Sequence, residues 1–213
     1  MDELKKGKLN MIKKLLTYSV AVATVVWSVG LLATPLAVGA AVSGDLIKLQ
    51  CSAGSGVNDP CRAVYYLGAD GKRYVFPNEK TYSTWYSDFS GVTTVADTVM
   101  SSYSIGGNVT YRPGTKLVKI TTDPKVYAVA GNGTLMWMTT GDLAESIYGA
   151  DWASMVEDVP DAFFVNYTVG SDIDDAADYD ETTQMDGSPN INDDKNLTDG
   201  GDGPVASTGT SLT

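Results

Sequence analysis

Two stretches of sequence decide the fold: VYYLGADG at residues 64–71 and VYAVAGNG at residues 126–133. They align residue for residue at a constant offset of 62 positions. Each is rich in strand-favouring residues and ends in Asp-Gly or Asn-Gly, a pair typical of tight hairpin turns because both turn positions need a positive φ. The sequence therefore predicts two β-hairpins at equivalent places in the chain.

The similarity extends to both sides of these hairpins. Downstream, short helices are expected to begin at Asn78 and Thr140, which offer N-cap side chains and are followed by an acidic residue in the first turn. Upstream, residues 46–49 and 117–120 correspond as opening strands, now at an offset of 71. The nine extra residues of the first copy form an insertion between its two cysteines.

A closing segment completes each copy, since residues 92–97 resemble residues 156–161 once two residues are inserted. The expected fold class is α+β, with duplicated β-hairpin–helix units forming one domain at residues 42–169. The copies span about 45–111 and 115–169. One such unit is too small to bury a core alone, so the copies are expected to pack on each other.

Composition bounds the classes of function. The chain has 213 residues, 43% of them hydrophobic and 19% charged, with no His and a net charge of −11. Residues 1–44 carry +3, residues 45–169 carry −4 and residues 170–213 carry −10. Because no basic stripe is available to neutralise phosphates, nucleic acid is not expected as a partner.

The N-terminus carries an export or membrane signal. Residues 15–42 contain no charged side chain and follow Lys13 and Lys14, and small residues surround Ala40. This layout is typical of a secretory signal peptide cut after residue 40 or 41. The alternative is a retained membrane anchor, an N-terminal apolar helix that spans the bilayer through residues 15–34. Both place the rest of the chain outside the cytoplasm, so we expect a secreted or cell-surface protein.

The two cysteines, Cys51 and Cys61, flank a Gly- and Asn-containing loop. In an oxidising compartment such a pair is expected to form a structural disulfide. Two thiols without His would leave a tetrahedral zinc half-ligated, and the spacing is not that of a Cys-x-x-Cys redox pair.

The C-terminal part, residues 170–213, is acidic and poor in large apolar side chains. Such a segment cannot offset the entropy of ordering, so we expect a disordered linker or tail. Its carboxylates could also bind Ca²⁺ weakly, although the order of an EF-hand loop is not present. The candidate ligands are Asp172, Asp174, Asp175, Asp178 and Asp180.

The run from Val64 to Glu79, VYYLGADGKRYVFPNE, with Trp85-Tyr86 and Val159-Pro160-Asp161-Ala162-Phe163, resembles a module found in uncharacterised exported proteins of uncultivated small-genome bacteria. The resemblance covers about residues 45–169. It implies a surface or envelope protein, often with later β-sandwich-like domains, and carries over no activity and no functional residue. Here a short acidic tail stands in place of such domains.

Aromatic side chains supply the candidate binding residues. Trp85, Tyr86, Trp137 and Trp152 could stack on sugar rings, and the alternative is that they fill the core. We expect a non-enzymatic protein of the cell envelope that adheres to wall or extracellular glycan, without a cofactor. The alternatives are a self-associating subunit of a surface layer or filament, and an exported glycosidase-like enzyme. For the last, the chain shows no activated nucleophile, having neither His nor a Gly-x-Ser-x-Gly elbow.

Overall fold

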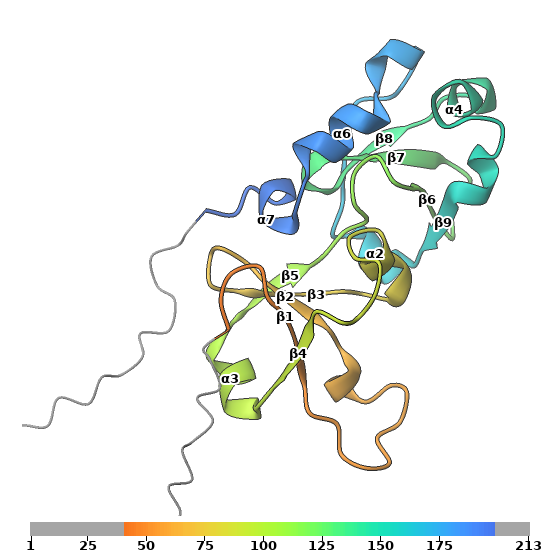
Figure 1. The fold of residues 1–213 in the computed structure, drawn as a ribbon. Coiled ribbons are helices and arrows are strands. Elements are labelled where there is room, and N and C mark those ends of the chain that lie inside the picture. Colours follow the sequence, from red (N-terminus) through yellow and green to blue (C-terminus); the bar gives the residue numbers. More distant parts are fainter. Residues whose placement is uncertain (1–40, 199–213) are drawn as a thin grey trace, which may run out of the picture. The chain divides into compact units, whose positions relative to one another are not determined.

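A computed structural model describes residues 41–198 of the chain (Figure 1). The predicted signal peptide or anchor lies outside the described residues except for its last residue, as do residues 199–213. Within the described part the fold is α+β and contains two five-stranded sheets. No helix of this part has the length and apolar character that a bilayer crossing requires.

The first sheet has the strand order β4-β1-β2-β3-β5. Its strands are β1 (Leu46–Leu49), β2 (Tyr65–Leu67), β3 (Arg73–Val75), β4 (Val92–Val95) and β5 (Ile105–Asn108). Strands β1, β2 and β3 are antiparallel neighbours, whereas β4 and β5 join the two edges in parallel. The sheet therefore consists of a central meander with one returning strand on each side.

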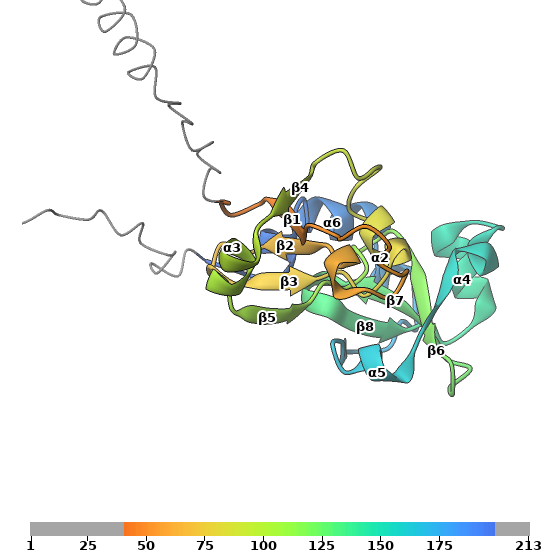
Figure 2. The same ribbon diagram turned by 90° about the horizontal axis from the view of Figure 1, so that it is seen from below.

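The second sheet has the equivalent order, β9-β6-β7-β8-β10, and the same strand directions. Its strands are β6 (Leu117–Ile120), β7 (Val126–Ala130), β8 (Thr134–Trp137), β9 (Val156–Val159) and β10 (Thr168–Val169). The register agrees as well: Leu46 lies opposite Tyr66, and Leu117 lies opposite Ala128. The hairpins expected near residues 65 and 127 are both present, and Figure 2 shows the strands of each lying side by side.

Each hairpin is followed by a short helix with the predicted N-cap. Asn78 caps α2 (Glu79–Ser83) by accepting a hydrogen bond from Thr81 N at 2.8 Å. Thr140 caps α4 (Gly141–Tyr148) by accepting one from Leu143 N at 3.2 Å. A second short helix follows the returning strand in each half, α3 (Asp97–Ser102) and α5 (Asp161–Phe164). The 3-10 helices are η1 (Pro60–Arg62), η2 (Gly131–Gly133), η3 (Trp152–Met155) and η4 (Ala176–Asp178).

The two hairpin turns differ in their backbone. At the second turn both Asn132 and Gly133 have positive φ, 59° and 65°, as the sequence predicts. At the first turn only Gly71 has a positive φ, 73°. The prediction of two positive φ angles is wrong there because a longer loop connects β2 to β3, and the Asp70 side chain accepts hydrogen bonds from Lys72 N and Tyr74 Oη.

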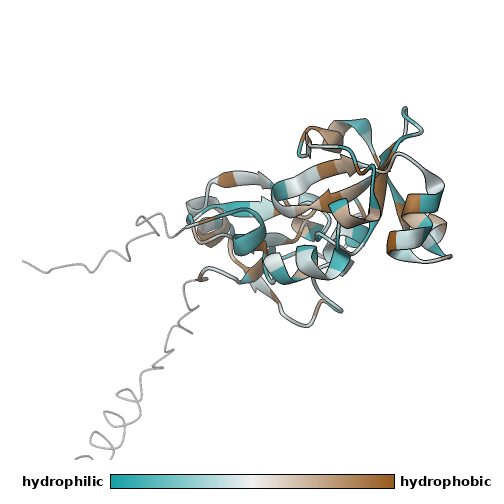
Figure 3. Cartoon of the chain, turned by 90° about the horizontal axis from the view of Figure 1, so that it is seen from above, coloured by the Kyte–Doolittle hydropathy of each residue, from teal (hydrophilic) through white to brown (hydrophobic). Residues whose placement is uncertain are grey.

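Buried apolar side chains form four clusters, and each lies on one face of one sheet. Leu46 and Tyr66 face the cluster under α2, whereas their neighbours Ile47 and Leu67 face the cluster under α3. The second sheet divides its apolar residues in the same alternating way between two further clusters. In Figure 3 hydrophobic stretches, in brown, accordingly recur within the strands.

Each half therefore has apolar clusters of its own, and the expectation that one unit is too small to bury a core alone needs correction. With its returning strands, each sheet is large enough to carry a cluster of buried apolar side chains on each of its two faces. The halves meet through a smaller contact instead. Tyr111 packs into a cluster of the second sheet, and its backbone N donates to Tyr167 Oη at 3.1 Å.

A larger correction concerns the acidic C-terminal part. The prediction of a disordered tail is wrong for residues 171–198, which contain η4, α6 (Glu181–Gly187) and α7 (Ile191–Asp194) and which we call the C-terminal strap. Three apolar side chains anchor the strap, because Ile173 and Tyr179 are buried against the second sheet and Ile191 against the first. Figure 1 shows α6 and α7, in blue, running past both sheets.

Side chains of the strap also bind backbone groups of both halves. Asn192 Oδ1 accepts from Ala69 N at 2.9 Å in the first half, and Tyr179 Oη donates to Val129 O at 2.7 Å in the second. Two of its acidic residues are helix N-caps: Asp175 and Asp180 accept hydrogen bonds from backbone N–H groups of the first turns of η4 and α6. Composition predicts disorder, but a few well-placed anchors and helix caps are enough to fix the segment.

Candidate functional site

Two grooves lie at equivalent positions in the two halves, where each hairpin meets its short helix. The first groove has a volume of about 470 Å³ and the second about 300 Å³. Nine of the ten residues that line the second groove have a counterpart 62 positions earlier in the first. These pairs are Arg62/Pro124, Ala63/Lys125, Val64/Val126, Val75/Trp137, Phe76/Met138, Pro77/Thr139, Asn78/Thr140, Glu79/Gly141 and Tyr82/Ala144. The tenth residue, Trp152, corresponds to Phe89 with one residue inserted.

The second groove combines aromatic surface with hydrogen-bonding groups. Trp137, on β8, and Trp152, at the start of η3, are half-buried and contribute their rings to its lining. Lys125 Nζ lies 4.3 Å from the centroid of the Trp137 ring, within the range of a cation–π contact. Thr139 Oγ1 donates to Ile173 O at 2.8 Å, so this hydroxyl retains acceptor capacity.

The lining of the first groove contains more aromatic residues than that of the second. Tyr82 and Phe89 stack with ring centroids 4.3 Å apart and an interplanar angle of 13°, and Phe76 packs edge-on against Tyr82 at 5.0 Å. The Tyr82 hydroxyl donates to Asp88 O at 2.7 Å and so fixes the loop that carries Phe89. Phe163, from α5 of the second half, also lines this groove.

The disulfide loop forms one wall of the first groove. Cys51 and Cys61 are joined as predicted, with their Cα atoms 5.2 Å apart. Five groove residues, Val57, Asn58, Asp59, Pro60 and Arg62, lie on or beside this loop. The insertion that distinguishes the first half from the second thus supplies part of the lining of the first groove.

The four aromatic residues singled out from the sequence do not form one platform. Trp137 and Trp152 line the second groove together, whereas Trp85 and Tyr86 pack against the core cluster under α2. Trp85 Nε1 donates to Thr110 O at 2.9 Å, and the Arg112 guanidinium lies 5.7 Å from the ring. Core packing therefore accounts for Trp85 and Tyr86.

Sequence reasoning missed Lys125, Phe89 and Tyr82 as groove residues. The alignment at an offset of 62 could have indicated Lys125, because it stands beside the opening residue of the second hairpin. Phe89 lies in a polar loop and is 49% exposed, and nothing in its local sequence indicates that it lines a groove. Its role depends on stacking against Tyr82, which only the folded chain brings close.

Of the five aspartates proposed as weak Ca²⁺ ligands, Asp175, Asp178 and Asp180 accept hydrogen bonds from backbone N–H groups of the strap. Asp178 Oδ2 accepts from the backbone N of both Asp174 and Asp175, at 3.1 and 2.9 Å. Asp180 Oδ1 accepts from Thr183 N at 2.6 Å, and hydrogen bonding to the side chain and then to the backbone of Thr183 lowers the pKa of Asp180. Within residues 41–198, no three acidic or cysteine side chains are grouped so that they could hold a metal ion. Asp172 lies exposed beside them.

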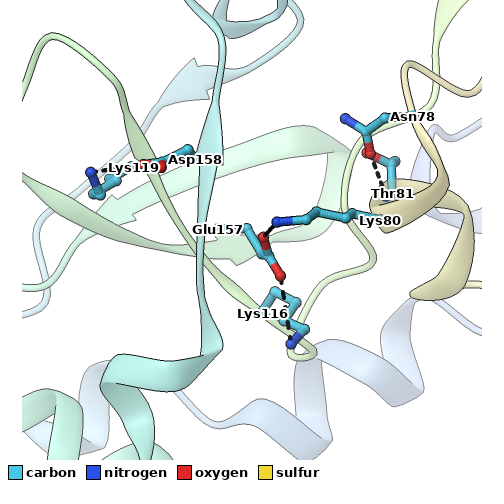
Figure 4. Close-up of polar contacts among 7 residues, drawn as sticks. All are labelled: Asn78, Lys80, Thr81, Lys116, Lys119, Glu157 and Asp158. Carbon is cyan, nitrogen blue, oxygen red and sulfur yellow. Dashed lines mark hydrogen bonds and ion pairs between the residues drawn. The ribbon is translucent and has the colours of Figure 1, made fainter.

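The junction between the halves is polar (Figure 4). Lys80, on α2, forms an ion pair with Glu157, on β9, and Lys116 approaches the same carboxylate to 4.0 Å. Deeper at the junction, Asp194 of the strap is only 2% exposed, and its Oδ1 accepts from Asn132 N at 3.0 Å. Burial raises the pKa of Asp194 and lowers that of the neighbouring Lys195.

Tyrosine hydroxyls near the junction are not acidified. Burial raises the pKa of Tyr111 to about 12, and it raises the pKa of Tyr179 to about 12 as well. These groups are therefore protonated at neutral pH. Tyr179 Oη accepts from Gly114 N and donates to Val129 O, whereas the buried Tyr111 Oη has no hydrogen-bond partner among residues 41–198. Their chemistry fits a structural role.

Comparisons with models of protein families, with curated proteins and with solved structures found no match. The functional interpretation therefore rests on the geometry of the two grooves.

Proposed function

We propose that the protein is an extracytoplasmic binding module of the cell envelope, and that the second groove takes a sugar ring of a wall or extracellular glycan. The observation that carries the proposal is that Trp137 and Trp152 line one open groove together with Lys125. Sugar rings present apolar C–H faces and polar edges. Aromatic rings can pack against the apolar C–H faces, and nearby hydrogen-bond donors and acceptors can bind the hydroxyl groups at the edges.

The polar groups at the groove are suited to the edge of such a ring. Lys125 is exposed and offers donors beside the Trp137 ring. Thr139 retains an acceptor, and Thr140 Oγ1, which accepts from Leu143 N, keeps its proton to donate. The site contributes binding alone, and the proposal includes no catalytic step.

The disulfide supports the proposed location, since such bonds persist mainly in oxidising compartments. The leader expected at residues 1–41 supports it from the sequence. We also propose that the halves arose by duplication, because their sheets agree in strand order, direction and register.

A matched pair of variants tests the sugar site. We expect the wild-type chain to bind a trimer of β-1,4-linked N-acetylglucosamine in isothermal titration calorimetry. Trp152→Ala should weaken this binding about tenfold, because an aromatic contact contributes about 0.5–1.5 kcal/mol. Phe89→Ala, at the equivalent place in the other half, should leave it unchanged. Failure of the trimer and of insoluble wall glycan to bind would contradict the proposal.

Self-association is a second candidate function, favoured by one observation. The edge strands β5 and β10 expose apolar side chains at equivalent positions, Ile105 at 63% and Val169 at 55%. Exposed edge strands can pair with strands of another copy. Sedimentation of the wild-type chain should then show concentration-dependent oligomers, and Ile105→Lys should reduce them. A monomer at all concentrations would remove this candidate.

A further inference from the structure

The first groove has the opposite charge pattern to the second. Where the second groove has Lys125, the first has Ala63, and where the second has Gly141, the first has Glu79. The disulfide loop adds a second carboxylate, Asp59. The first groove is therefore lined by two carboxylates, whereas the second is lined by the ammonium group of Lys125.

Both carboxylates keep oxygens for a ligand. Asp59 Oδ1 accepts from Cys61 N at 3.0 Å, which leaves Oδ2 without a hydrogen bond in the described part of the chain. Glu79 is exposed and makes neither an ion pair nor a side-chain hydrogen bond with residues 41–198. Each can therefore accept a hydrogen bond from a cationic group that enters the groove.

The one basic side chain in the lining, Arg62, is already engaged. Its Nε donates to Gly56 O at 2.8 Å and its Nη2 donates to Ser55 O at 3.1 Å. Arg62 thus holds the disulfide loop in shape, and its donors satisfy the loop carbonyls. The carboxylates of Asp59 and Glu79 outnumber its single positive charge.

The aromatic wall suits the same kind of ligand. The rings of Phe89, which is 49% exposed, and of Phe163 line the groove, and the buried ring of Tyr82 supports Phe89 by stacking on it. A cation within about 6 Å of such a ring is attracted to its face, and an alkyl chain gains from the apolar lining.

We propose that the first groove binds an alkylammonium group, the group in which the side chains of lysine and of other diamino acids end. The alkyl chain lies along Phe89 and Phe163, and the ammonium group reaches Glu79 and Asp59. This site goes beyond the sugar proposed for the second groove and does not depend on it, because the two ligands and the two sets of residues differ.

The test compares two probes with the same four-carbon side chain, one of which also carries the terminal ammonium group, on the full chain with its disulfide intact. We expect Nα-acetyl-lysine amide to bind about tenfold more tightly than Nα-acetyl-norleucine amide, which lacks the charge. The bound lysine derivative should shift the NMR signals of Val57 and Phe89, and added salt should weaken its binding selectively. Equal affinity of the two probes, or shifts confined to other parts of the chain, would overturn the proposal.

Variants of single carboxylates test which of them binds the ammonium group. Glu79→Gln and Asp59→Asn should each reduce the preference for the lysine derivative several-fold, and the amide oxygen introduced by Asp59→Asn can still accept from Cys61 N. Asp142→Asn, an exposed acid in the first turn of the equivalent helix, serves as the matched control and should change nothing. An equal loss in Asp142→Asn would show a diffuse charge effect and would refute the site.

The disulfide provides a second test of the same groove. Replacing Cys51 and Cys61 by Ser removes the constraint on the wall that carries Asp59, so lysine-derivative binding should fall while binding of the sugar trimer stays the same. Unchanged binding of the lysine derivative in this variant would contradict the assignment of the loop to the site.

Discussion

The two halves of the molecule share one backbone plan but fill it with different side chains. Between the short helix and the sheet of the first half lie two large aromatic side chains, Tyr82 from α2 and Tyr66 from β2, each 2% exposed. The equivalent positions of the second half hold Ala128 and Ala144, both fully buried. The sheets keep the same register although the volume at these positions differs by two phenol rings.

The missing volume in the second half comes from elsewhere in the chain. Ile173 and Tyr179 of the strap pack into that cluster, and Tyr148 and Trp152 cover it. In the first half the strap contributes mainly Ile191. The comparison shows that different segments of the chain supply the bulky side chains at equivalent places in the two halves.

The largest expected effect tests this exchange of volume. Tyr82→Ala should cost about 3–5 kcal/mol of the free energy of unfolding, because the first half has no other segment to fill the cavity. Ala144→Tyr should cost about 1–3 kcal/mol, because the strap already occupies the space. Urea unfolding measures both. A control, Val57→Ala, lies at an 84% exposed position and should change stability by less than about 0.5 kcal/mol.

If Tyr82→Ala unfolded no more easily than this control, the view of the first half as a separately filled core would be wrong.

The strap provides the next test, since it is anchored in both halves. Ile173→Ala and Ile191→Ala should each cost about 2–5 kcal/mol, because both side chains are fully buried. Hydrogen exchange should then distinguish the halves: Ile191→Ala should speed exchange in β1–β3, and Ile173→Ala in β6–β8. Loss of protection in neither sheet would show that the strap is not part of the fold.

The helix caps should behave alike in the two halves. Asn78→Ala and Thr140→Ala each remove one hydrogen bond to a first-turn N–H, and each should cost about 1 kcal/mol in urea unfolding. Thr93→Ala, on the exposed face of β4, is the control and should be nearly neutral. A large difference between the two cap variants would break the equivalence of the helices.

The smallest expected effect is a change in pH dependence caused by Asp194. Burial raises its pKa in the folded state above the unfolded value of about 3.9. The carboxyl therefore favours folding most at pH values below 3.9, and this contribution is lost as the pH rises through the folded pKa. Asp194→Asn should thus gain stability relative to wild type as the pH is raised from about 4 to 7.

Urea unfolding at several pH values measures this difference, and Asp142→Asn is the exposed control. Parallel pH profiles for wild type and Asp194→Asn would mean that the buried carboxyl does not titrate with folding.

Much of the local structure follows from sequence alone. The hairpins, the caps Asn78 and Thr140 and the disulfide are encoded by neighbouring residues, through turn chemistry, capping side chains and the spacing of the cysteines. The partner segments at residues 92–97 and 156–161 could also be aligned, because each returning strand keeps its apolar residues.

The strap and the grooves could not be predicted in this way. Ile173, Tyr179 and Ile191 are isolated apolar residues in an acidic segment, and only distant clusters on two sheets give them a place. Trp85 and Trp137 look alike as sequence candidates, yet the fold places one in the core and one in a groove. Contacts between residues far apart in the sequence decide whether such a side chain lies in the core or in a groove, and composition gives no information on these contacts.

The most direct test of the central claim, that the second groove binds sugar through two tryptophans, uses the indole N–H signals in ¹⁵N NMR. During titration with the N-acetylglucosamine trimer, the signals of Trp137 and Trp152 should shift together, while that of Trp85, whose Nε1 is bonded to Thr110 O, should stay fixed. Indole signals that do not move, or a shift of Trp85 alone, would contradict the account.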